Sequence, residues 1–279
     1  MRWQCKNRSI DLASPIVMGV LNVTPDSFSD GGRYAAAGAA FDRAVQMIGE
    51  GAQILDIGGE STKPGSSRIP AGVQIQRVVP VIERIAASQD VAISIDTSEP
   101  DVMRAAISAG ACIVNDVSAL RRSDARAVCA AAGVGVCLMH MQGEPLHMQD
   151  NPQYGNVVTE VGAFLTDQRA LCIQAGIAPG AVVFDPGLGF GKSFLHNMTL
   201  LKEIRALSGL GSPLLIGVAR KSFIGKMLGK QVHERLYGGL GLAVYAVIEG
   251  ARIIRTHDVA PTVEAIGTVT AVLQGSQYT

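Results

Sequence analysis

Short runs of apolar residues recur along the chain, and each run stops at a polar or charged residue before a segment with helical spacing begins. A strand that is buried on both faces of a parallel sheet reads as an almost continuous apolar run. The runs therefore predict eight buried strands, at about residues 16–21, 52–57, 91–96, 112–115, 135–139, 182–185, 214–218 and 252–255.

Helical spacing fills the segments between these runs. Apolar residues recur at intervals of three and four from Phe41 to Ile48 and from Ile75 to Ala86, which is typical of one buried helix face. Glycine often comes just before the next strand, as at Gly110. A residue without Cβ adopts the left-handed conformation that ends a helix at no steric cost.

Strict alternation of strand and helix predicts a parallel sheet, and eight such units in 279 residues predict closure into a single-domain (β/α)8 TIM barrel, an α/β fold, over residues 1–279. Periodicity alone leaves an open, doubly wound sheet as the alternative. Residues 2–11 are expected to form a short hairpin that covers the barrel floor. Long loops are expected after strands one, two and five, at about residues 23–36, 58–70 and 140–153.

Composition narrows the class of protein. The 24 basic residues balance the 24 acidic ones, which does not favour nucleic acid or a membrane surface as a partner. Five scattered cysteines without a C-x-x-C pair are typical of free thiols in a reducing compartment. Neither a signal peptide nor a membrane-spanning apolar stretch is recognisable, so we expect a cytoplasmic protein.

Polar residues at the strand ends are the first candidates for chemistry, because the carboxyl ends of all barrel strands gather at one face. Asp56, Asp96, Asn115 and Asp185 each end an apolar run. Capping of the following helix is the structural alternative for each of these carboxylates. Taken together, such acceptors suit a flat heterocycle with several N–H donors, since one carboxylate can accept two adjacent N–H groups.

Residues 185–193, DPGLGFGKS, contain a glycine-rich loop. It is not a P-loop, because three residues rather than four separate Gly187 from the Gly191-Lys192 pair. We expect its glycines to let the backbone lie close to a planar ligand, with Phe190 as one wall of the site.

Cationic residues follow the last two runs. Arg255 and His257 point the same way if the strand continues through both; they are candidates for gripping a pyrophosphate, with Asn22 helping to hold a Mg²⁺ on its oxygens. A structural histidine is the alternative for His257. Lys221 is a candidate Schiff-base nucleophile or a cation that holds the heterocycle, unless it is a solvated loop lysine. Ser222 begins the next helix, where free N–H groups favour a carboxylate.

Eight segments together resemble the dihydropteroate synthase family of pterin-binding barrels, in order and over nearly the whole chain. They are MGVLNVTPDSFSDGG (18–32), DIGGESTKPG (56–65), SIDTS (94–98), ND (115–116), LMHMQG (138–143), DPGLGFGK (185–192), ARKSFIG (219–225) and RTHDV (255–259). The resemblance implies a (β/α)8 barrel, usually a homodimer. It also implies a Mg²⁺-dependent condensation of 6-hydroxymethyl-7,8-dihydropterin pyrophosphate with 4-aminobenzoate, and inhibition by sulfonamides, which imitate the aminobenzoate.

The resemblance also assigns roles to individual residues. The residues implied to hold the pterin are Asp96, Asn115, Met139, Asp185 and Lys221. Those implied to meet the pyrophosphate are Asn22, which is also a Mg²⁺ ligand, Thr62, Arg255 and His257. Those implied to contact the aminobenzoate are Phe28, Pro64, Phe190 and Ser222. The implied catalytic set is Asp30, Lys63, Asp96, Asp185 and Lys221.

One position departs from the family pattern. The family usually has arginine in its S-T-R-P-G loop, whereas this chain has Lys63. Lysine keeps the charge but cannot form the planar fork of arginine, which predicts weaker closure of this loop. Three alternatives stay open: a pterin-barrel methyltransferase module that uses methyltetrahydrofolate, a Schiff-base aldolase, and a non-catalytic pterin-binding protein.

Overall fold

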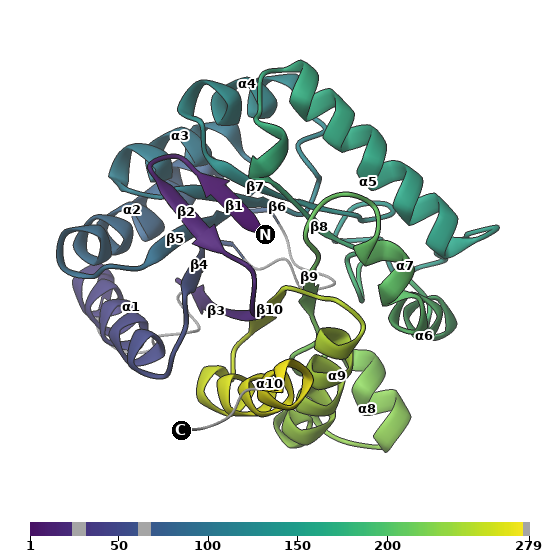
Figure 1. Cartoon of the computed structure of the whole chain (residues 1–279). Helices are drawn as coiled ribbons and strands as arrows, with labels where there is room; N and C mark the ends of the chain where they lie inside the picture. The colour runs from purple at the N-terminus through teal and green to yellow at the C-terminus, as the bar shows by residue number, and fades with distance from the viewer. Residues whose placement is uncertain (24–31, 61–67, 276–279) are drawn as a thin grey trace.

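Eight parallel strands form the central sheet of the chain, for which the computed structural model describes residues 1–23, 32–60 and 68–275 (Figure 1). In the order in which they pair, the strands are β8 (Val182–Asp185), β7 (Gly135–Met139), β6 (Ile113–Asp116), β5 (Ala92–Asp96), β4 (Ile54–Gly58), β3 (Ile16–Asn22), β10 (Ile253–Thr256) and β9 (Leu215–Gly217). Each lies within two residues of its predicted position.

The sheet closes on itself between β8 and β9. Phe184 forms a parallel bridge with Leu214, and the Phe184 N–H donates a hydrogen bond of 2.9 Å to the Pro213 carbonyl oxygen. The first strand of the barrel, β3, pairs with the last, β10. This order contains no reversal of the kind that defines a doubly wound sheet, so the prediction of a closed barrel is confirmed.

Helices surround the barrel and follow its strands (Figure 1). They are α1 (Gly32–Gly49), α2 (Ala71–Ser88), α3 (Pro100–Ala109), α4 (Ser123–Ala132), α5 (Val157–Gln174), α6 (Phe194–Lys202), α7 (Ile204–Ser208), α8 (Ser222–Leu228), α9 (Leu236–Ile248) and α10 (Val259–Gln274), with short 3-10 helices at Pro179–Ala181 and Val232–Glu234. Among the described residues, no helix is long and apolar enough to span a membrane. Gly110 ends α3 at a φ of 127°, as its position before a strand predicted.

Alternate residues of a strand separate two packing layers. Ile93 and Ile95 pack outward in the large core shared with the helices, whereas Ala92 belongs to the inner layer. Ser94 and Asp96 have the same parity as Ala92 and are also buried. Ser94 and Asp96 therefore lie on the inner face of the barrel, the same face as Ala92.

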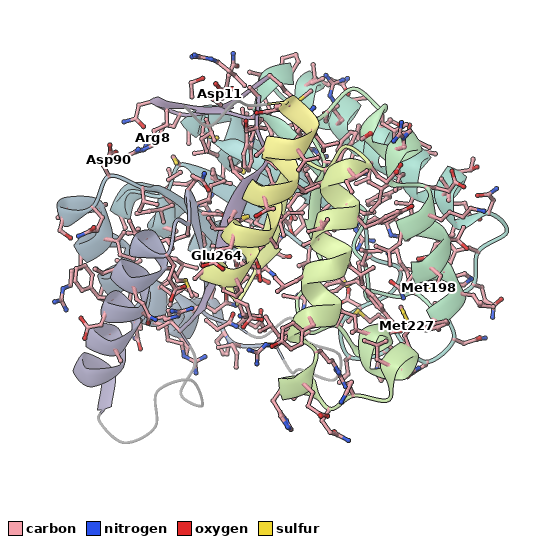
Figure 2. The ribbon with its side chains drawn as sticks, turned by 60° about the horizontal axis from the view of Figure 1, so that its bottom comes forward. Arg8, Asp11, Asp90, Met198, Met227 and Glu264 are labelled. Carbon is pink, nitrogen blue, oxygen red and sulfur yellow. The ribbon has the colours of Figure 1, made fainter. Side chains whose placement is uncertain are left out.

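The predicted hairpin covers the barrel floor. Strands β1 (Arg2–Cys5) and β2 (Arg8–Asp11) pair in antiparallel fashion. Trp3 is fully buried in the inner layer of the barrel, and its Nε1–H donates a hydrogen bond of 2.8 Å to the Ala181 carbonyl oxygen. Figure 2 shows the outer side of the hairpin, where Arg8 forms an ion pair of 2.8 Å with Asp90.

The three predicted long loops differ in how well their predicted bounds agree with the structure. The first was expected to reach residue 36, but α1 already begins at Gly32, because residues 33–37 include three alanines, which favour helix over loop. The third extends to residue 156, before α5. Residues 24–31 and 61–67 of the first and second loops lie outside the described residues. All five cysteines are buried and free, as predicted.

We predict that Trp3→Ala lowers the free energy of unfolding by about 3–5 kcal/mol, because it removes a fully buried indole from the barrel floor. Urea denaturation followed by circular dichroism measures this loss. Tryptophan fluorescence does not serve, because Trp3 is the single tryptophan of the chain and the substitution removes it. Val272→Ala, at a side chain that is 76% exposed, is the control and should change stability by less than about 0.5 kcal/mol. A Trp3→Ala loss below about 1 kcal/mol would contradict the role assigned to the hairpin.

Candidate active site

Arg255 lies at the mouth of the barrel between two buried carboxylates. Its Nε–H donates to Asp56 Oδ2 at 2.6 Å and its Nη2–H to Asp96 Oδ2 at 2.7 Å. Burial opposes the charge of Arg255, but the two carboxylates raise its pKa above the ordinary value. The guanidinium therefore stays protonated and joins the ends of β4, β5 and β10.

Asn115 extends this network to the neighbouring strand β6. Its side-chain Nδ2–H donates to Asp56 Oδ2 at 2.9 Å, so one carboxylate oxygen serves both Asn115 and Arg255. Asp56 is fully buried. The sequence pattern identifies Asp56 only as one of several polar strand ends, whereas its contacts show that it holds Asn115 and Arg255 in place.

Three buried acceptors beside this network have no hydrogen-bond partner among the described residues. They are Asp56 Oδ1, Asp96 Oδ1 and Ser94 Oγ. Unpaired buried acceptors are rare in native proteins because each loses its hydration without compensation. Burial raises the pKa of Asp96 to about 7, with a smaller contribution from Asp56 and against the opposing effect of Arg255. This part of the site is therefore suited to a ligand that brings its own N–H donors.

Asp185 and Lys221 interact electrostatically at the same mouth. Asp185 ends β8, and its Oδ1 accepts a hydrogen bond of 2.7 Å from the Gly187 N–H. Burial raises the pKa of Asp185, and Lys221 and Arg255 both counteract that rise. Burial also lowers the pKa of Lys221 to about 8, against the attraction of Asp185. The structure thus brings the predicted acidic and cationic residues into one electrostatic neighbourhood.

An apolar wall borders these charges. Met139, at the end of β7, packs with Val117, Met141 and Met148, and the partly buried Phe190 packs against this cluster. Lys221 Nζ lies 4.5 Å from the centroid of the Phe190 ring, within the range of a cation–π interaction. Met139 and Phe190 therefore belong to one apolar cluster beside Lys221, and their contact with a ligand remains a prediction.

The glycine-rich loop after β8 was predicted to lie close to a planar ligand, but two of its glycines instead lie close to the backbone of a neighbouring segment. Gly187 has a φ of 67° and Gly191 a φ of 59°, and a Cβ at either residue would overlap a carbonyl oxygen, that of His140 or of Gln142 respectively. These two glycines therefore allow close packing against the segment after β7 rather than against a ligand. Gly189 alone lies next to Lys221, whose Cδ would be 3.5 Å from an added Cβ.

Lys192, the last residue of that loop motif, has a role that the sequence reasoning missed. Its Nζ lies 3.0 Å from His140 Nδ1, 3.2 Å from the His140 carbonyl oxygen and 2.9 Å from the Phe190 carbonyl oxygen. Burial lowers the pKa of Lys192 to about 7 and that of His140 to about 3, so His140 is neutral. Lys192 fastens the loop that carries Phe190 to the end of β7. The signal for it was a lysine within an otherwise apolar, glycine-rich segment.

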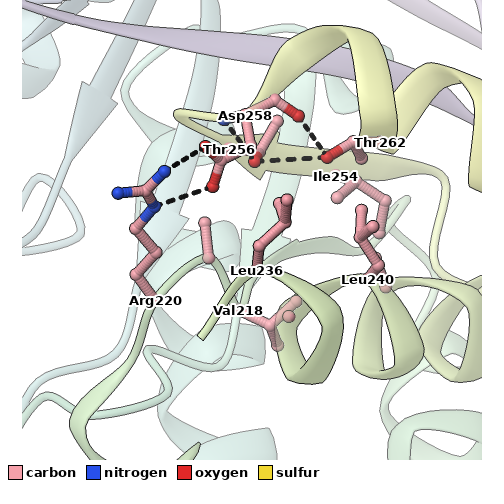
Figure 3. Close-up of a pocket in the computed structure, with 11 residues that line it drawn as sticks. Val218, Arg220, Leu236, Leu240, Ile254, Thr256, Asp258 and Thr262 are labelled. Atoms are coloured by element: carbon pink, nitrogen blue, oxygen red, sulfur yellow. Dashed lines mark hydrogen bonds and ion pairs between the residues drawn. The ribbon is translucent and has the colours of Figure 1, made fainter. Parts of the chain in front are cut away.

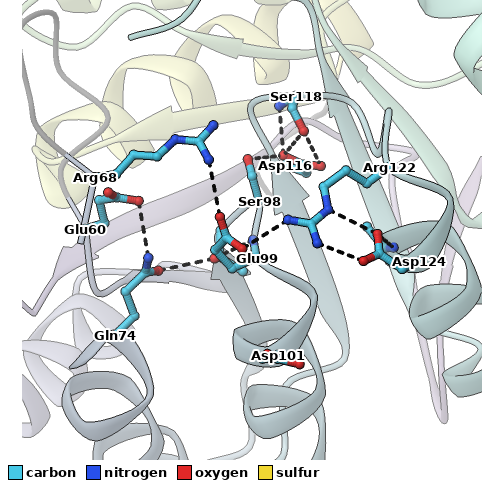
Figure 4. Close-up of polar contacts among 12 residues, drawn as sticks. Glu60, Arg68, Gln74, Ser98, Glu99, Asp101, Asp116, Ser118, Arg122 and Asp124 are labelled. Carbon is cyan, nitrogen blue, oxygen red and sulfur yellow. Dashed lines mark hydrogen bonds and ion pairs between the residues drawn. The ribbon is translucent and has the colours of Figure 1, made fainter. Parts of the chain in front are cut away.

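Asp116 is used locally, although not as a helix cap, since α4 has Arg122 at its N-cap and no side-chain cap bond. It is fully buried and accepts hydrogen bonds of 2.8 Å from the N–H groups of Ser118 and Leu120, as well as from the Ser98 hydroxyl (Figure 4). These bonds hold the turn after β6 and use the carboxylate locally.

A second polar network lies where the long loop after β4 rejoins the barrel (Figure 4). Arg68 forms ion pairs with Glu99 at 3.5 Å and with Glu144 at 3.0 Å, and Glu60 accepts a hydrogen bond of 2.6 Å from the Ile69 N–H. A cavity of about 460 Å³ lies beside these residues and reaches Asp96. The entrance to the site is therefore bordered by charged side chains from several loops.

The remaining predicted residues are less closely grouped. Asn22 ends β3 and is half-buried; a Cβ added at Gly58 would lie 3.5 Å from its Oδ1 and 3.6 Å from the Cβ of Asp96. Ser222 is exposed at the start of α8. His257 is also exposed and lies beyond Thr256, where β10 ends, so the strand geometry that would have aligned it with Arg255 does not extend to it.

Five predicted residues lie outside the described part of the chain: Phe28, Asp30, Thr62, Lys63 and Pro64. Their roles remain predictions. Within the described residues, no cluster of three or more histidine, cysteine, aspartate or glutamate side chains could hold a metal ion. A metal that shares the ligands of a phosphate needs few protein groups, and Asn22 offers an amide oxygen of that kind.

Comparison with known proteins places this site in a family. The model of the pterin-binding enzyme family matches residues 18–257, and the chain therefore belongs to the pterin-binding enzymes. Within that class the similarity is to dihydropteroate synthases. The chain is 47% identical over 277 residues to the dihydropteroate synthase of Escherichia coli (strain K12), covering 99% of this chain and 98% of the relative.

Solved structures agree. The dihydropteroate synthase of Yersinia pestis with a sulfonamide drug superposes with a TM-score of 0.93 at 42% identity, covering 98% of this chain and 100% of that one. The Xanthomonas albilineans dihydropteroate synthase with 4-aminobenzoic acid gives a TM-score of 0.92 at 43% identity, covering 99% of both chains. The same enzyme in complex with 7,8-dihydropteroate gives 0.89 at 40%, covering 99% and 100%.

We predict that Lys192→Met lowers stability, and that the loss grows as pH rises from about 7 toward 10. Because the pKa of Lys192 is lowered to about 7 in the folded protein, the folded state binds fewer protons than the unfolded state in this window, and wild-type stability rises with pH. Methionine does not titrate, so the Lys192→Met variant lacks this pH-dependent contribution to stability. The loss should be larger at pH 9 than at pH 6.5 by roughly 1–3 kcal/mol.

Urea denaturation at the two pH values measures this difference, with Lys226→Met on the exposed side of α8 as the control. A Lys192→Met loss that is equal at both pH values would show that Lys192 does not titrate as described.

Proposed function

We propose that this chain is a dihydropteroate synthase, which condenses 6-hydroxymethyl-7,8-dihydropterin pyrophosphate with 4-aminobenzoate to give 7,8-dihydropteroate and pyrophosphate. The observation that carries the proposal is the network of Asn115, Asp56, Arg255 and Asp96, whose unpaired acceptor oxygens lie at the barrel mouth. A pterin presents ring and amino N–H donors that would satisfy such acceptors. The proposal is supported by the similarity to enzymes of this name.

The pterin ring would lie among Asp96, Asn115, Asp185 and Lys221, with Met139 packed against its face. Asp96 and Asp185 are buried, and Asp96 Oδ1 is unpaired, so this oxygen would be a strong acceptor for a ring N–H group. Asn115 is oriented by its bond to Asp56, which leaves its amide oxygen for the ligand. This arrangement supports recognition of a planar heterocycle over a flexible substrate.

The diphosphate would leave toward Arg255, which is one-fifth exposed, with Asn22, Thr62 and His257 around it. Asn22 fits a Mg²⁺ ion because it offers a hard oxygen donor near the carboxylate end of the site, and Mg²⁺ retains several waters beside substrate phosphates. When bound, Mg²⁺ would neutralise charge on the departing pyrophosphate.

The aminobenzoate ring would lie against Phe190 and the aliphatic stem of Lys221, with its carboxylate at Ser222. Phe28, Asp30, Lys63 and Pro64 would close over it, as the family resemblance implies. We expect sulfonamides to compete at this position, as the sulfonamide complex of the Yersinia pestis relative suggests.

The reaction breaks the bond between the pterin methylene carbon and a pyrophosphate oxygen, and the bonding electron pair leaves with the pyrophosphate. The neutral aryl amine then attacks the methylene carbon through its nitrogen lone pair, and the resulting ammonium transfers a proton to solvent water. Asp96 and Asp185 would stabilise positive charge on the pterin, while the cationic side of the site stabilises the leaving group. We infer a dissociative displacement, because buried carboxylates on the pterin side and Arg255 on the pyrophosphate side would stabilise the charges that separate as this bond breaks.

We also propose that the protein is a homodimer that associates through α9. Tyr237, Gly241, Tyr245 and Ile248 are exposed along one side of this helix, and the helix is strongly apolar. Tyr237 is 82% exposed. Aromatic side chains around a small residue form a surface that a second copy could bury.

We predict that Asp185→Asn and Lys221→Met each lower pyrophosphate release by roughly 100-fold or more, the typical effect of removing one preorganised charge-stabilising group. The assay uses the purified chain with both substrates and Mg²⁺. Asp124→Asn, at an exposed ion pair with Arg122, is the control and should keep wild-type turnover. Near-normal turnover in both site variants would refute the pocket assignment.

Three measurements on the same purified chain separate the alternatives. A non-catalytic pterin-binding protein would release no pyrophosphate, and a Schiff-base aldolase would give an adduct at Lys221 that borohydride traps. A methyltransferase module would not consume 4-aminobenzoate.

We predict that Tyr245→Glu combined with Ile248→Glu weakens self-association at least 100-fold, because two charges would enter an apolar contact. Light scattering after size exclusion should then give a molar mass near the 29.2 kDa of one chain rather than about twice that value. Val272→Glu on α10, at a side chain 76% exposed, is the control. A wild-type chain that stays monomeric at micromolar concentration would exclude the dimer.

A further inference from the structure

The side chains of Arg220 and Asp258 form a two-bond fork outside the barrel mouth (Figure 3). Arg220 Nε donates to Asp258 Oδ2 at 2.9 Å, and Nη2 donates to Asp258 Oδ1 at 2.6 Å. Such a bidentate pair fixes the orientation of both groups as well as their distance. It links the loop after β9 to the loop after β10.

The fork lies where the sheet no longer connects these two loops. Strands β9 and β10 pair up to Gly217 and Arg255, and β9 ends there, whereas Lys221 comes four residues later. Beyond Gly217 the backbone of the β9 loop is therefore not held by sheet hydrogen bonds to β10. The Arg220–Asp258 fork is a side-chain link between the two segments just past this point.

Both ends of the fork are anchored to the protein. The Asp258 N–H donates to Thr256 Oγ1 at 3.0 Å, and the Asp258 carbonyl oxygen accepts from Thr262 Oγ1 at 2.6 Å (Figure 3). Both threonines are buried. On the other side, the Arg220 carbonyl oxygen accepts a bond of 3.3 Å from Arg235 Nη1.

The backbone of Arg220 has a left-handed conformation, which the anchored fork helps to hold. Its φ is +52°, in the left-handed region that residues with a Cβ adopt at an energetic cost. Such conformations persist where the surroundings hold them. At this turn the Arg220 side chain meets Asp258, whereas the next residue, Lys221, has its ammonium over the ring of Phe190.

We propose that Arg220 and Asp258 are positioning residues that set where Lys221 and Ser222 lie relative to Arg255. The inference rests on the function proposed above. Phe190, Lys221 and Ser222 are the described residues assigned to the aminobenzoate, and two of these three follow Arg220 directly. Lys221 also borders the pterin, but the other polar groups assigned to the pterin, Asp96, Asn115 and Asp185, lie on β5, β6 and β8, so the pterin depends less on this loop.

The solvent exposure of the two side chains indicates that the Arg220–Asp258 pair positions the loop more than it stabilises the fold. The Arg220 and Asp258 side chains are 37% and 16% exposed, and ion pairs that reach solvent contribute little to global stability. Loss of the fork should therefore change the kinetics of one substrate much more than it changes thermal unfolding.

The test is steady-state pyrophosphate release by Arg220→Met, Asp258→Asn and the double variant. We expect kcat/KM for 4-aminobenzoate to fall at least 10-fold, mainly through KM, while KM for the pterin substrate changes less than 3-fold. Because the two residues act as one unit, the double variant should lose no more than either single variant. Asp258→Asn retains the shape of the side chain, so it tests loss of the fork even if Arg220→Met does not fold.

Two further variants make the test specific. Arg220→Gly accommodates the positive φ but has no fork, and it should behave like Arg220→Met. Arg205→Met removes a comparable fork to Glu249, with distances of 2.9 and 3.4 Å, at the other end of α9 from the mouth, and it should keep wild-type kinetics.

Wild-type kinetics in Arg220→Gly or in Asp258→Asn would overturn the positioning role, as would losses that add in the double variant. Equal losses for both substrates together with a lowered melting temperature would overturn it in favour of a structural role. Failure of the wild-type chain and of Arg205→Met to release any pyrophosphate would instead refute the proposed function itself.

Discussion

The charge balance around Arg255 is the constraint on which the rest of the site depends. Asp56 and Asp96 lie on adjacent strands at the barrel mouth, and their two buried carboxylates would repel each other without a cation between them. Arg255 supplies that cation from β10 and leaves one oxygen of each carboxylate unpaired. The same interaction therefore permits burial of the acids and retains acceptors for a ligand.

The sequence was sufficient for the architecture because barrel strands have a strong local signal. Each buried strand is an apolar run that ends at a polar residue, and eight repetitions leave few other topologies. The same argument located Asp96, Asn115, Asp185 and Arg255 at one face, since strand direction alone brings their ends together. The roles of individual residues came from resemblance to a family rather than from this pattern.

The contacts within the site could not be predicted in the same way. That Asp56 holds both Asn115 and Arg255 depends on side-chain rotamers across three strands, which no linear pattern encodes. Lys192 was missed because the sequence does not distinguish a buried lysine from a solvated one. Two of its three acceptors are atoms of His140, 52 positions earlier in the chain, and the third is the carbonyl oxygen of Phe190 in its own loop. His257 was aligned with Arg255 on the assumption that β10 continues, but it ends at Thr256.

The hairpin at the barrel floor has a consequence for synthesis on the ribosome. Trp3 bonds to Ala181, 178 positions further along the chain, so the first strand emerges long before its acceptor has been translated. Until then its indole has no native partner at that end of the barrel, and the nascent polypeptide carries an unburied aromatic group near its N-terminus. A chain that folds during its synthesis leaves such surface exposed until later segments have been made, so the floor of this barrel cannot be completed before the residues around Ala181 have emerged.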